Sequence, residues 1–266
     1  MLPLFILPFL LIAQKSGQQY APEGLFQLAN PILTTGQVFF TGKTKASLEL
    51  GVDGMEMRYT LNGSEPTQAS QLYVEPVLVT ESCTFKARAF HECCQPSEVV
   101  AARFFKLPTD KKVKKIALKN PPHESYPGSG ADGLVDWKKG SLDFHQPAWM
   151  GFSGEDVVAI LEFEHAIEIS KVTASVLLNL GAWIFPPAGM EVYDSQDGQS
   201  FELLGKKETD SPGQDAKAGF EYFQLSFAPQ QCKFLKVILK KQPSLPAWHP
   251  GNGSPAWLFV DEIWPE

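Results

Sequence analysis

The chain has 266 residues, 44% of them hydrophobic and 20% charged, which gives enough length for two domains and too apolar a composition for a disordered polyampholyte. Its formal net charge of −7 argues against nucleic acid and anionic membranes as partners. The 21 glycines and 21 prolines are spread along the chain and indicate many turns, and therefore many short strands.

The N-terminus opens on residues 2–13, an apolar run that only prolines interrupt. A membrane-spanning helix needs about 20 apolar residues, so this run fits the core of a signal peptide better. No Lys or Arg precedes it, and Leu11 stands where a small residue is preferred before cleavage after Ala13. We nevertheless expect residues 1–19 to be a signal peptide. The protein would then be exported to a periplasm, a cell surface or the medium, without a transmembrane anchor once the signal is removed.

Residues 25–107 alternate between apolar and polar side chains. Met57 and Tyr59 face one way while Arg58 and Thr60 face the other, which is typical of a half-buried strand. The pair Asn62-Gly63 ends this run and suits a tight turn. About 80 residues of short strands predict an immunoglobulin-like sandwich.

The second part of the chain follows a lysine-rich segment, 108–115, which we interpret as a solvated linker. Alternation then resumes, for example at residues 172–176 and 235–239. Residues 157–163 are almost continuously apolar, which indicates a strand buried on both faces. Residues 116–266 therefore predict a β-sandwich of the jelly-roll type, so the whole chain is expected to be all-β.

Four cysteines are present, namely Cys83, Cys93, Cys94 and Cys232, and none has the spacing of a zinc site. Cys83 either forms a disulfide with Cys93 or Cys94 or stays a buried free thiol. Cysteine usage leaves the redox compartment open.

The chain end, 257–266, is apolar and aromatic and also carries Asp261 and Glu262. Chain ends are usually disordered unless they are tied down, so we expect a strand whose carboxylates meet a cation or a donor-rich loop. The oxygen-rich loop 136–143 is the expected partner. As sequence neighbours on a strand, Asp261 and Glu262 are expected to point to opposite faces, which excludes them as a glycosidase pair.

The first segment resembles the C-terminal domain of chitobiases and β-hexosaminidases. The resemblance rests on M-R-Y-T-L-N-G-S-E-P-T at residues 57–67, F-K-A-R-A-F at 85–90 and P-S-E-V-V at 96–100. It implies a small immunoglobulin-like module that accompanies glycoside hydrolases. The catalytic barrel of those enzymes would need about 250 further residues, so the resemblance concerns the accessory domain alone.

The second segment resembles the discoidin fold, also called coagulation factor 5/8 type C, whose carbohydrate-binding members form family 32 of the carbohydrate-binding modules. The matching motifs follow the family order: L-V-D at 134–136, G-S at 140–141, D-F at 143–144, W-M-G-F at 149–152, W-I-F-P-P at 183–187, Y-D-S-Q-D-G-Q-S-F at 193–201 and W-L-F-V-D-E-I at 257–263. One departure is Trp137, which stands where the family commonly has glycine.

A calcium ion is the first expected ligand. Ca²⁺ takes six to eight hard oxygen ligands, and Asp136, Ser141 and Glu262 offer side-chain oxygens. The resemblance implies the same site, because discoidin-like proteins often hold a structural calcium between this loop and the terminal glutamate. The alternative is that Asp136 caps its own turn and Glu262 is a solvated strand end.

A saccharide is the second expected ligand. Sugars stack on aromatic rings and hydrogen-bond to a few polar groups, so loop aromatics are the candidates. We expect Trp248, His249 and Asn252, in the Pro/Gly-rich loop 246–253, together with Trp183, to bind it. For Trp183 the alternative is a packing role, because W-I-F-P belongs to the family pattern itself.

No catalytic constellation, phosphate loop or nucleophile elbow is visible in the sequence. The sequence therefore predicts an exported, non-catalytic carbohydrate-binding protein stabilised by calcium. The alternative is an accessory tail of a β-hexosaminidase-type hydrolase, or a module that docks on protein. A separate glycoside hydrolase is a candidate partner in either case.

Overall fold

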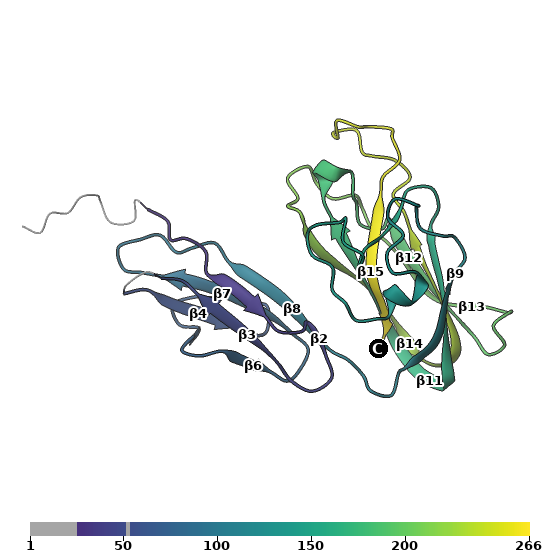
Figure 1. Cartoon of the computed structure of the whole chain (residues 1–266), viewed down its shortest axis with the longest axis horizontal. Coiled ribbons are helices and arrows are strands. Elements are labelled where there is room, and N and C mark those ends of the chain that lie inside the picture. The colour runs from purple at the N-terminus through teal and green to yellow at the C-terminus, as the bar shows by residue number, and fades with distance from the viewer. Residues whose placement is uncertain (1–25, 52–53) are drawn as a thin grey trace, which may run out of the picture. The chain divides into compact units, whose positions relative to one another are not determined.

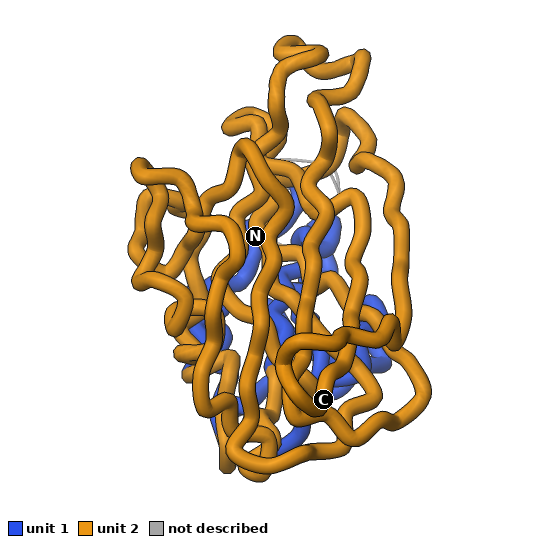
Figure 2. Tube along the Cα trace, turned by 90° about the vertical axis from the view of Figure 1, so that its right-hand side faces the viewer, with its two compact units in different colours: residues 1–36, 44–104 blue, residues 37–43, 105–266 orange. Residues whose placement is uncertain are grey.

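The computed structural model describes residues 26–51 and 54–266, so the predicted signal peptide at residues 1–19 lies outside the described residues. The chain divides into two compact units, one of residues 1–36 and 44–104 and one of residues 37–43 and 105–266 (Figure 2). Apart from two short 3-10 helices, the regular elements of the described chain are strands, so the expected all-β class is confirmed (Figure 1). Among these residues no helix is long and apolar enough to cross a membrane.

The first unit is built from two small sheets. One is antiparallel, with the strands β1 (Ile32–Thr35), β3 (Thr44–Glu49) and β6 (Val77–Val79) in that order. The other is ordered β2-β8-β7-β4-β5, with β2 (Phe39–Phe40), β8 (Val100–Lys106), β7 (Cys83–Phe90), β4 (Glu56–Thr60) and β5 (Gln71–Leu72). Alternate residues of β3 and β7 are buried, as the period of two predicts for sheets that pack face to face.

The stacked rings of Tyr59 and Phe85, 5.5 Å apart, lie in the interior of this sandwich. The turn at Gly63 has a φ of 79°, as the Asn-Gly pair predicts. Cys83 begins strand β7, whereas Cys93 and Cys94 follow its last residue, Phe90. An eight-residue strand spans more than about 20 Å, so a disulfide from Cys83 to either of them is excluded, and none of the four cysteines forms a disulfide.

The second unit contains seven strands of its own: β9 (Val113–Leu118), β10 (Met150–Phe152), β11 (Val157–Leu178), β12 (Gly189–Ser195), β13 (Glu202–Glu208), β14 (Gly219–Lys240) and β15 (Leu258–Pro265). Residues 37–43, which include β2, are also assigned to this unit, although β2 pairs with β8. The 3-10 helices η1 (Ala131–Leu134) and η2 (Leu180–Ala182) lie in its loops. Strand β9 begins at Val113, inside the segment 108–115 that we interpreted as a linker, because its residues pair with β11.

Two strands of 22 residues each, β11 and β14, organise this unit. They pair along their length, with register shifts between Glu162 and Ile167 and between Ile169 and Lys171, where the ladder is irregular. Before the shifts β11 also pairs with β9, and after them it pairs with β15. The same two strands therefore contribute to both layers of the sandwich, and the main core lies between the layers, with Ala159 and Leu161 from one and Val172 and Ala174 from the other.

Candidate functional site

Two loops at one end of the second unit carry the residues that are predicted to bind a saccharide. The loop 179–188 joins β11 to β12, and the loop 241–257, at the top of the unit in Figure 1, joins β14 to β15. Their backbones are hydrogen-bonded to each other, because Trp257 N donates to Trp183 O at 2.9 Å and Phe185 N donates to Trp257 O at 2.9 Å. These hydrogen bonds hold the two loops together as one surface, which we call the aromatic tip (Trp183, Trp248, His249 and Asn252).

Trp183 is held in an unusual backbone conformation. It caps η2 with a φ of 64° and leaves 39% of its surface exposed. Gly251 of the other loop lies against its ring, since a Cβ there would be 2.9 Å from Trp183 Cζ2. A left-handed backbone at a bulky residue is costly unless its surroundings stabilise it. Contacts from both loops therefore hold the Trp183 ring, which remains partly exposed.

His249 is the buried member of the aromatic tip and connects its two loops. The side chain is only 6% exposed, and its Nδ1 accepts the N–H of Gly251 at 3.0 Å. The proton therefore lies on Nε2, which donates to Leu180 O at 2.9 Å. Both ring nitrogens are engaged, so His249 positions the loops and has no hydrogen bond left to offer a ligand.

Trp248 completes the exposed surface, with 38% of its area accessible. Its ring centroid lies 5.7 Å from that of His249 and 6.2 Å from that of Phe185. Asn252 is exposed beside it, with its backbone N–H bonded to His249 O at 2.9 Å and its amide side chain directed by no protein hydrogen bond that we observe within the described chain. Of the four predicted residues, three are accessible and the fourth supports them.

The acidic chain end forms strand β15, and one expectation about it is wrong. Ser175 pairs with Glu262 and Val176 pairs with Val260, which leaves Asp261 as the extra residue of a β-bulge. Val260 and Ile263 both point into the main core. Because the bulge interrupts the alternation, Asp261 and Glu262 lie together on the opposite face, where the sequence predicted that they would diverge. Both are fully buried there.

The loop 136–143 covers that face, and Lys139 is its anchor. Lys139 Nζ donates to Asp261 Oδ2 at 2.7 Å and to Ser175 Oγ at 2.9 Å. It also lies 4.0 Å from the ring centroid of Phe220 and 4.7 Å from that of Trp149. Burial lowers the pKa of Lys139, while Asp261 opposes that shift. The sequence analysis expected this loop to supply oxygen ligands and missed the ion pair, which no local motif indicates.

Glu262 has no such cation. Neither of its carboxylate oxygens has a hydrogen-bond partner within the described chain, and both are buried. Burial, and then repulsion from Asp261 and Asp136, raise the pKa of Glu262 to about 10. Asp136 thus lies close to Glu262, as predicted, although its own Oδ1 accepts Lys138 N at 2.9 Å and caps the turn. The alternative of a solvated Glu262 is wrong, because the loop covers it.

The third predicted metal ligand, Ser141, is not directed toward Asp136 and Glu262. Ser141 is exposed, its Oγ accepts Asp143 N at 3.1 Å, and its carbonyl accepts Trp149 Nε1 at 2.8 Å. No group of three or more His, Cys, Asp or Glu side chains among residues 26–51 and 54–266 is arranged to hold a metal. The carboxylates of Asp136 and Glu262 lie near each other, whereas Ser141 is directed elsewhere. Trp137, with a φ of 63°, adopts the left-handed backbone that the family's glycine would allow.

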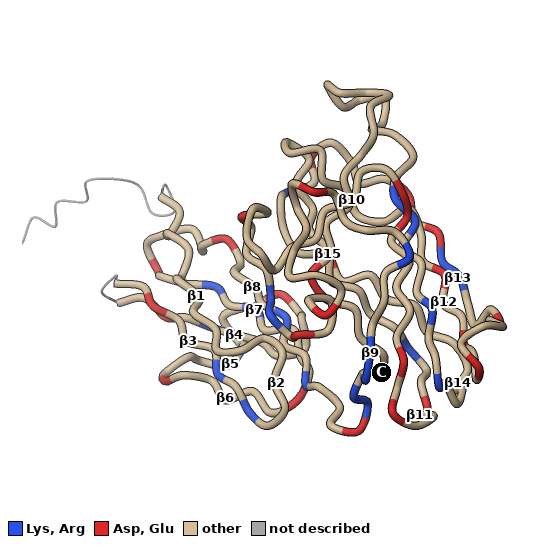
Figure 3. The backbone as a smooth tube through the Cα atoms, turned by 45° about the vertical axis from the view of Figure 1, so that its right-hand side comes forward, with Lys and Arg blue, Asp and Glu red and all other residues tan. Residues whose placement is uncertain are grey.

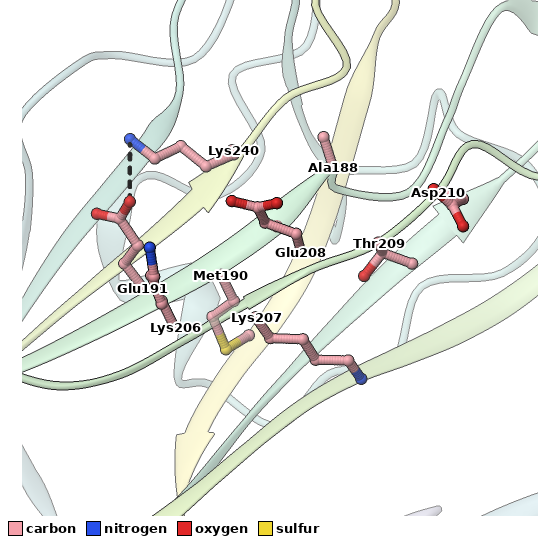
Figure 4. A pocket seen from close by; sticks show the side chains of 10 residues that line it. Ala188, Met190, Glu191, Lys206, Lys207, Glu208, Thr209, Asp210 and Lys240 are labelled. Carbon is pink, nitrogen blue, oxygen red and sulfur yellow. Dashed lines mark ion pairs between the residues drawn. The ribbon is translucent and has the colours of Figure 1, made fainter.

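A separate groove of about 660 Å³ lies beside the ends of β12, β13 and β14. Figure 4 shows its lining of Lys and Glu side chains, with Lys240 paired to Glu191 at 3.8 Å. No aromatic ring lines this groove, so it offers no surface for stacking.

Comparison with known proteins finds a family model that matches part of the chain, mostly within the first unit. Residues 34–101 match the sequence family described as the chitobiase/beta-hexosaminidase C-terminal domain. This region holds the Arg58-Tyr59-Thr60 motif on which the sequence resemblance rested, so the resemblance is confirmed for the first unit. A search of curated proteins found no match to the chain.

Solved structures similar to this chain include several carbohydrate-binding modules. A pectin-binding module is 16% identical over 59% of this chain and 91% of its own, with a TM-score of 0.38. A family 32 module from Clostridium perfringens, in complex with GalNAc-β-1,3-galactose, is 18% identical over 56% of this chain and 91% of its own, with a TM-score of 0.37. The family 32 module of AlyQ, in complex with 4,5-unsaturated mannuronic acid, is 11% identical over 60% of this chain and 98% of its own, with a TM-score of 0.37. The ligands in these structures are those of the proteins concerned.

Proposed function

We propose that the second unit binds a glycan at the aromatic tip. The observation that carries this proposal is the pair of half-exposed indoles, Trp183 and Trp248, held on two hydrogen-bonded loops around the buried His249. The C–H faces of a sugar ring stack on such rings, and exposed amides such as Asn252 supply the hydrogen bonds that orient it.

The same surface suits a sugar better than a protein partner. A protein-docking surface calls for a wide apolar patch. In loops 179–188 and 241–257 the large exposed apolar side chains are the two tryptophans, and the other exposed residues are proline, glycine, serine, alanine and asparagine. A site of two indole faces and one amide covers little of a ligand, so we expect weak single-site affinity that gains strength from several copies or from attachment to a partner.

The binding is proposed to be non-catalytic. Asp261 and Glu262 lie side by side across a bulge, but both are fully buried beneath loop 136–143, so no substrate reaches them. A glycosidase needs two carboxylates that flank an accessible scissile bond. The first unit would then serve as the accessory module that its family match indicates, with a separate hydrolase as a candidate partner of an exported protein.

Calcium is proposed as a structural ion at Asp136 and Glu262. A divalent cation there would compensate the two unpartnered oxygens of Glu262, which otherwise must be protonated to remain buried. Its role would be to fix the loop against strand β15, with no contact to the sugar.

A glycan array probed with the full chain, in calcium, tests the proposal. We expect Trp248→Ala and Trp183→Ala each to weaken binding at least about tenfold, because each removes one stacking face. Trp248→Phe should keep most of the affinity, and Leu203→Ala, an exposed residue of β13, is the matched control that should keep all of it. Failure of the wild type to bind any glycan, or full binding by both alanine variants, would refute the site.

A further inference from the structure

The segments that build the aromatic tip contain no charged residue. Residues 172–190 and 242–260 are free of Asp, Glu, Lys and Arg, although 20% of the chain is charged and about four charges would be expected in each. Both segments are bounded by charges, with Lys171, Glu191, Lys241 and Asp261 at their ends. The strand residues at the ends of these segments, 172–178, 189–190 and 258–260, are buried, so the lack of charge that concerns a ligand is that of the loops between them.

The charge distribution of the folded unit agrees with the sequence. In Figure 3 the long loop at the top carries neither Lys and Arg nor Asp and Glu, whereas the body of the unit carries both signs. His249 adds no charge, because its Nδ1 accepts the N–H of Gly251 and its ring is neutral in this arrangement.

Several backbone N–H groups of the two loops are already hydrogen-bonded, which limits how far the backbone can replace a cationic side chain. Anions without Lys or Arg are usually held by several free N–H groups. In loop 241–257 the N–H groups of His249, Gly251, Asn252, Gly253 and Ser254 are all bonded inside the loop. In the other loop Ala182, Trp183 and Ile184 donate to Asn179 or Leu180.

We infer that the glycan bound at the aromatic tip is uncharged, and that uronate, sialylated or sulfated glycans are excluded. The inference rests on the proposed function and specifies its ligand class. A carboxylate or sulfate brought against the indoles would lose water without gaining a cation, and the net charge of −7 adds repulsion at long range.

The test uses matched pairs of glycans that differ only in charge, such as oligogalacturonates against their methyl esters, sialylated glycans against the desialylated forms and sulfated against unsulfated chains. The full chain is titrated with both members of every pair in which one member binds. We expect the uncharged member to bind at least about tenfold more tightly, and the preference to shrink as salt rises.

A gain-of-charge variant sharpens the test. Ala247 is exposed next to Trp248, so Ala247→Lys should improve binding of the anionic member about fivefold, while Ala247→Gln, of similar length and no charge, should not. An anionic member that binds the wild type as tightly as its neutral partner, with binding still lost in Trp248→Ala, would overturn the inference and leave the proposed function standing. An Ala247→Lys protein with an unchanged preference would overturn it too. Binding to no member of any pair would overturn both.

Discussion

Lys139 and Asp261 are 122 residues apart in sequence, yet Lys139 Nζ lies 2.7 Å from Asp261 Oδ2 inside a shell that includes Trp149 and Phe220. Their pairing ties the loop 136–143 to the last strand. As a result, one of the two neighbouring carboxylates of β15, Asp261, is paired with a lysine, whereas the oxygens of the other, Glu262, have no hydrogen-bond partner in the described chain.

Removing the buried cation should destabilise the second unit. Lys139→Met keeps the side-chain length and leaves Asp261 buried without its partner, which costs about 3–5 kcal/mol. The melting temperature measured by calorimetry should fall by many degrees. Lys138→Met, whose ammonium pairs with Asp136 on the exposed side of the loop, is the control and should change little. The double variant Lys139→Met/Asp261→Asn should recover part of the loss, and an equally unstable double variant would speak against the pairing.

Calcium should stabilise the protein through Glu262. At a calcium concentration about a hundredfold above the dissociation constant, binding to the folded state alone adds about 2.7 kcal/mol. We expect the melting temperature of the second unit to drop on chelation, and Glu262→Gln to abolish the response. Ser141→Ala should retain it, because Ser141 Oγ is directed at Asp143 N. A melting temperature of the wild type that does not change on chelation would show that no calcium ion is bound at this site.

The protonation of Glu262 gives a pH dependence of defined sign in the chelated protein. Burial first, then the nearby acids, raise its pKa to about 10 from an ordinary 4.5. The stability that protonated Glu262 provides is complete below its unfolded pKa and is lost as the pH rises from about 4.5 toward about 10. Between about pH 5 and pH 9 in chelator, the melting temperature should therefore fall more steeply for the wild type than for Glu262→Gln. Parallel curves would show that the carboxyl is not buried as described.

Glycine at position 251 should matter for binding rather than for folding of the unit. A Cβ there would meet Trp183 Cζ2 at 2.9 Å and Leu245 Cδ1 at 2.9 Å, so Gly251→Ala must displace the ring. We expect about tenfold weaker glycan binding. Gly213→Ala, which meets nothing within 4 Å, is the matched control. Equal affinities for the two variants would show that the orientation of Trp183 is not required.

Cys232 should resist alkylation in the native protein. Burial and then repulsion from Asp194 raise the pKa of Cys232 to about 12, so the reactive thiolate is absent near pH 8. Mass spectrometry after treatment with iodoacetamide should find Cys232 unmodified until urea is added, while the exposed Cys93 serves as the accessible reference. Labelling of both at the same rate would contradict the buried position.

The sequence by itself determined the all-β class and the strand period, and it indicated that Trp248 would be exposed in its loop. These follow from local rules: alternation marks strands such as β7, Asn62-Gly63 marks a turn, and Trp248 in a Pro/Gly-rich loop has few ways to be buried. The proximity of Asp136 and Glu262 was also foreseeable, because a polar chain end needs a partner.

Only the tertiary structure decided what each of those residues does. The bulge at Asp261 turns two neighbouring carboxylates to one face, and the register that creates it is set by pairing with Ser175, 86 positions earlier in the numbering. Lys139 contacts Asp261 across 122 positions, and His249 contacts Leu180 across 69 positions. Such contacts depend on how layers pack and not on any local pattern, because the free energy that fixes them comes from burying partners that are distant in the chain.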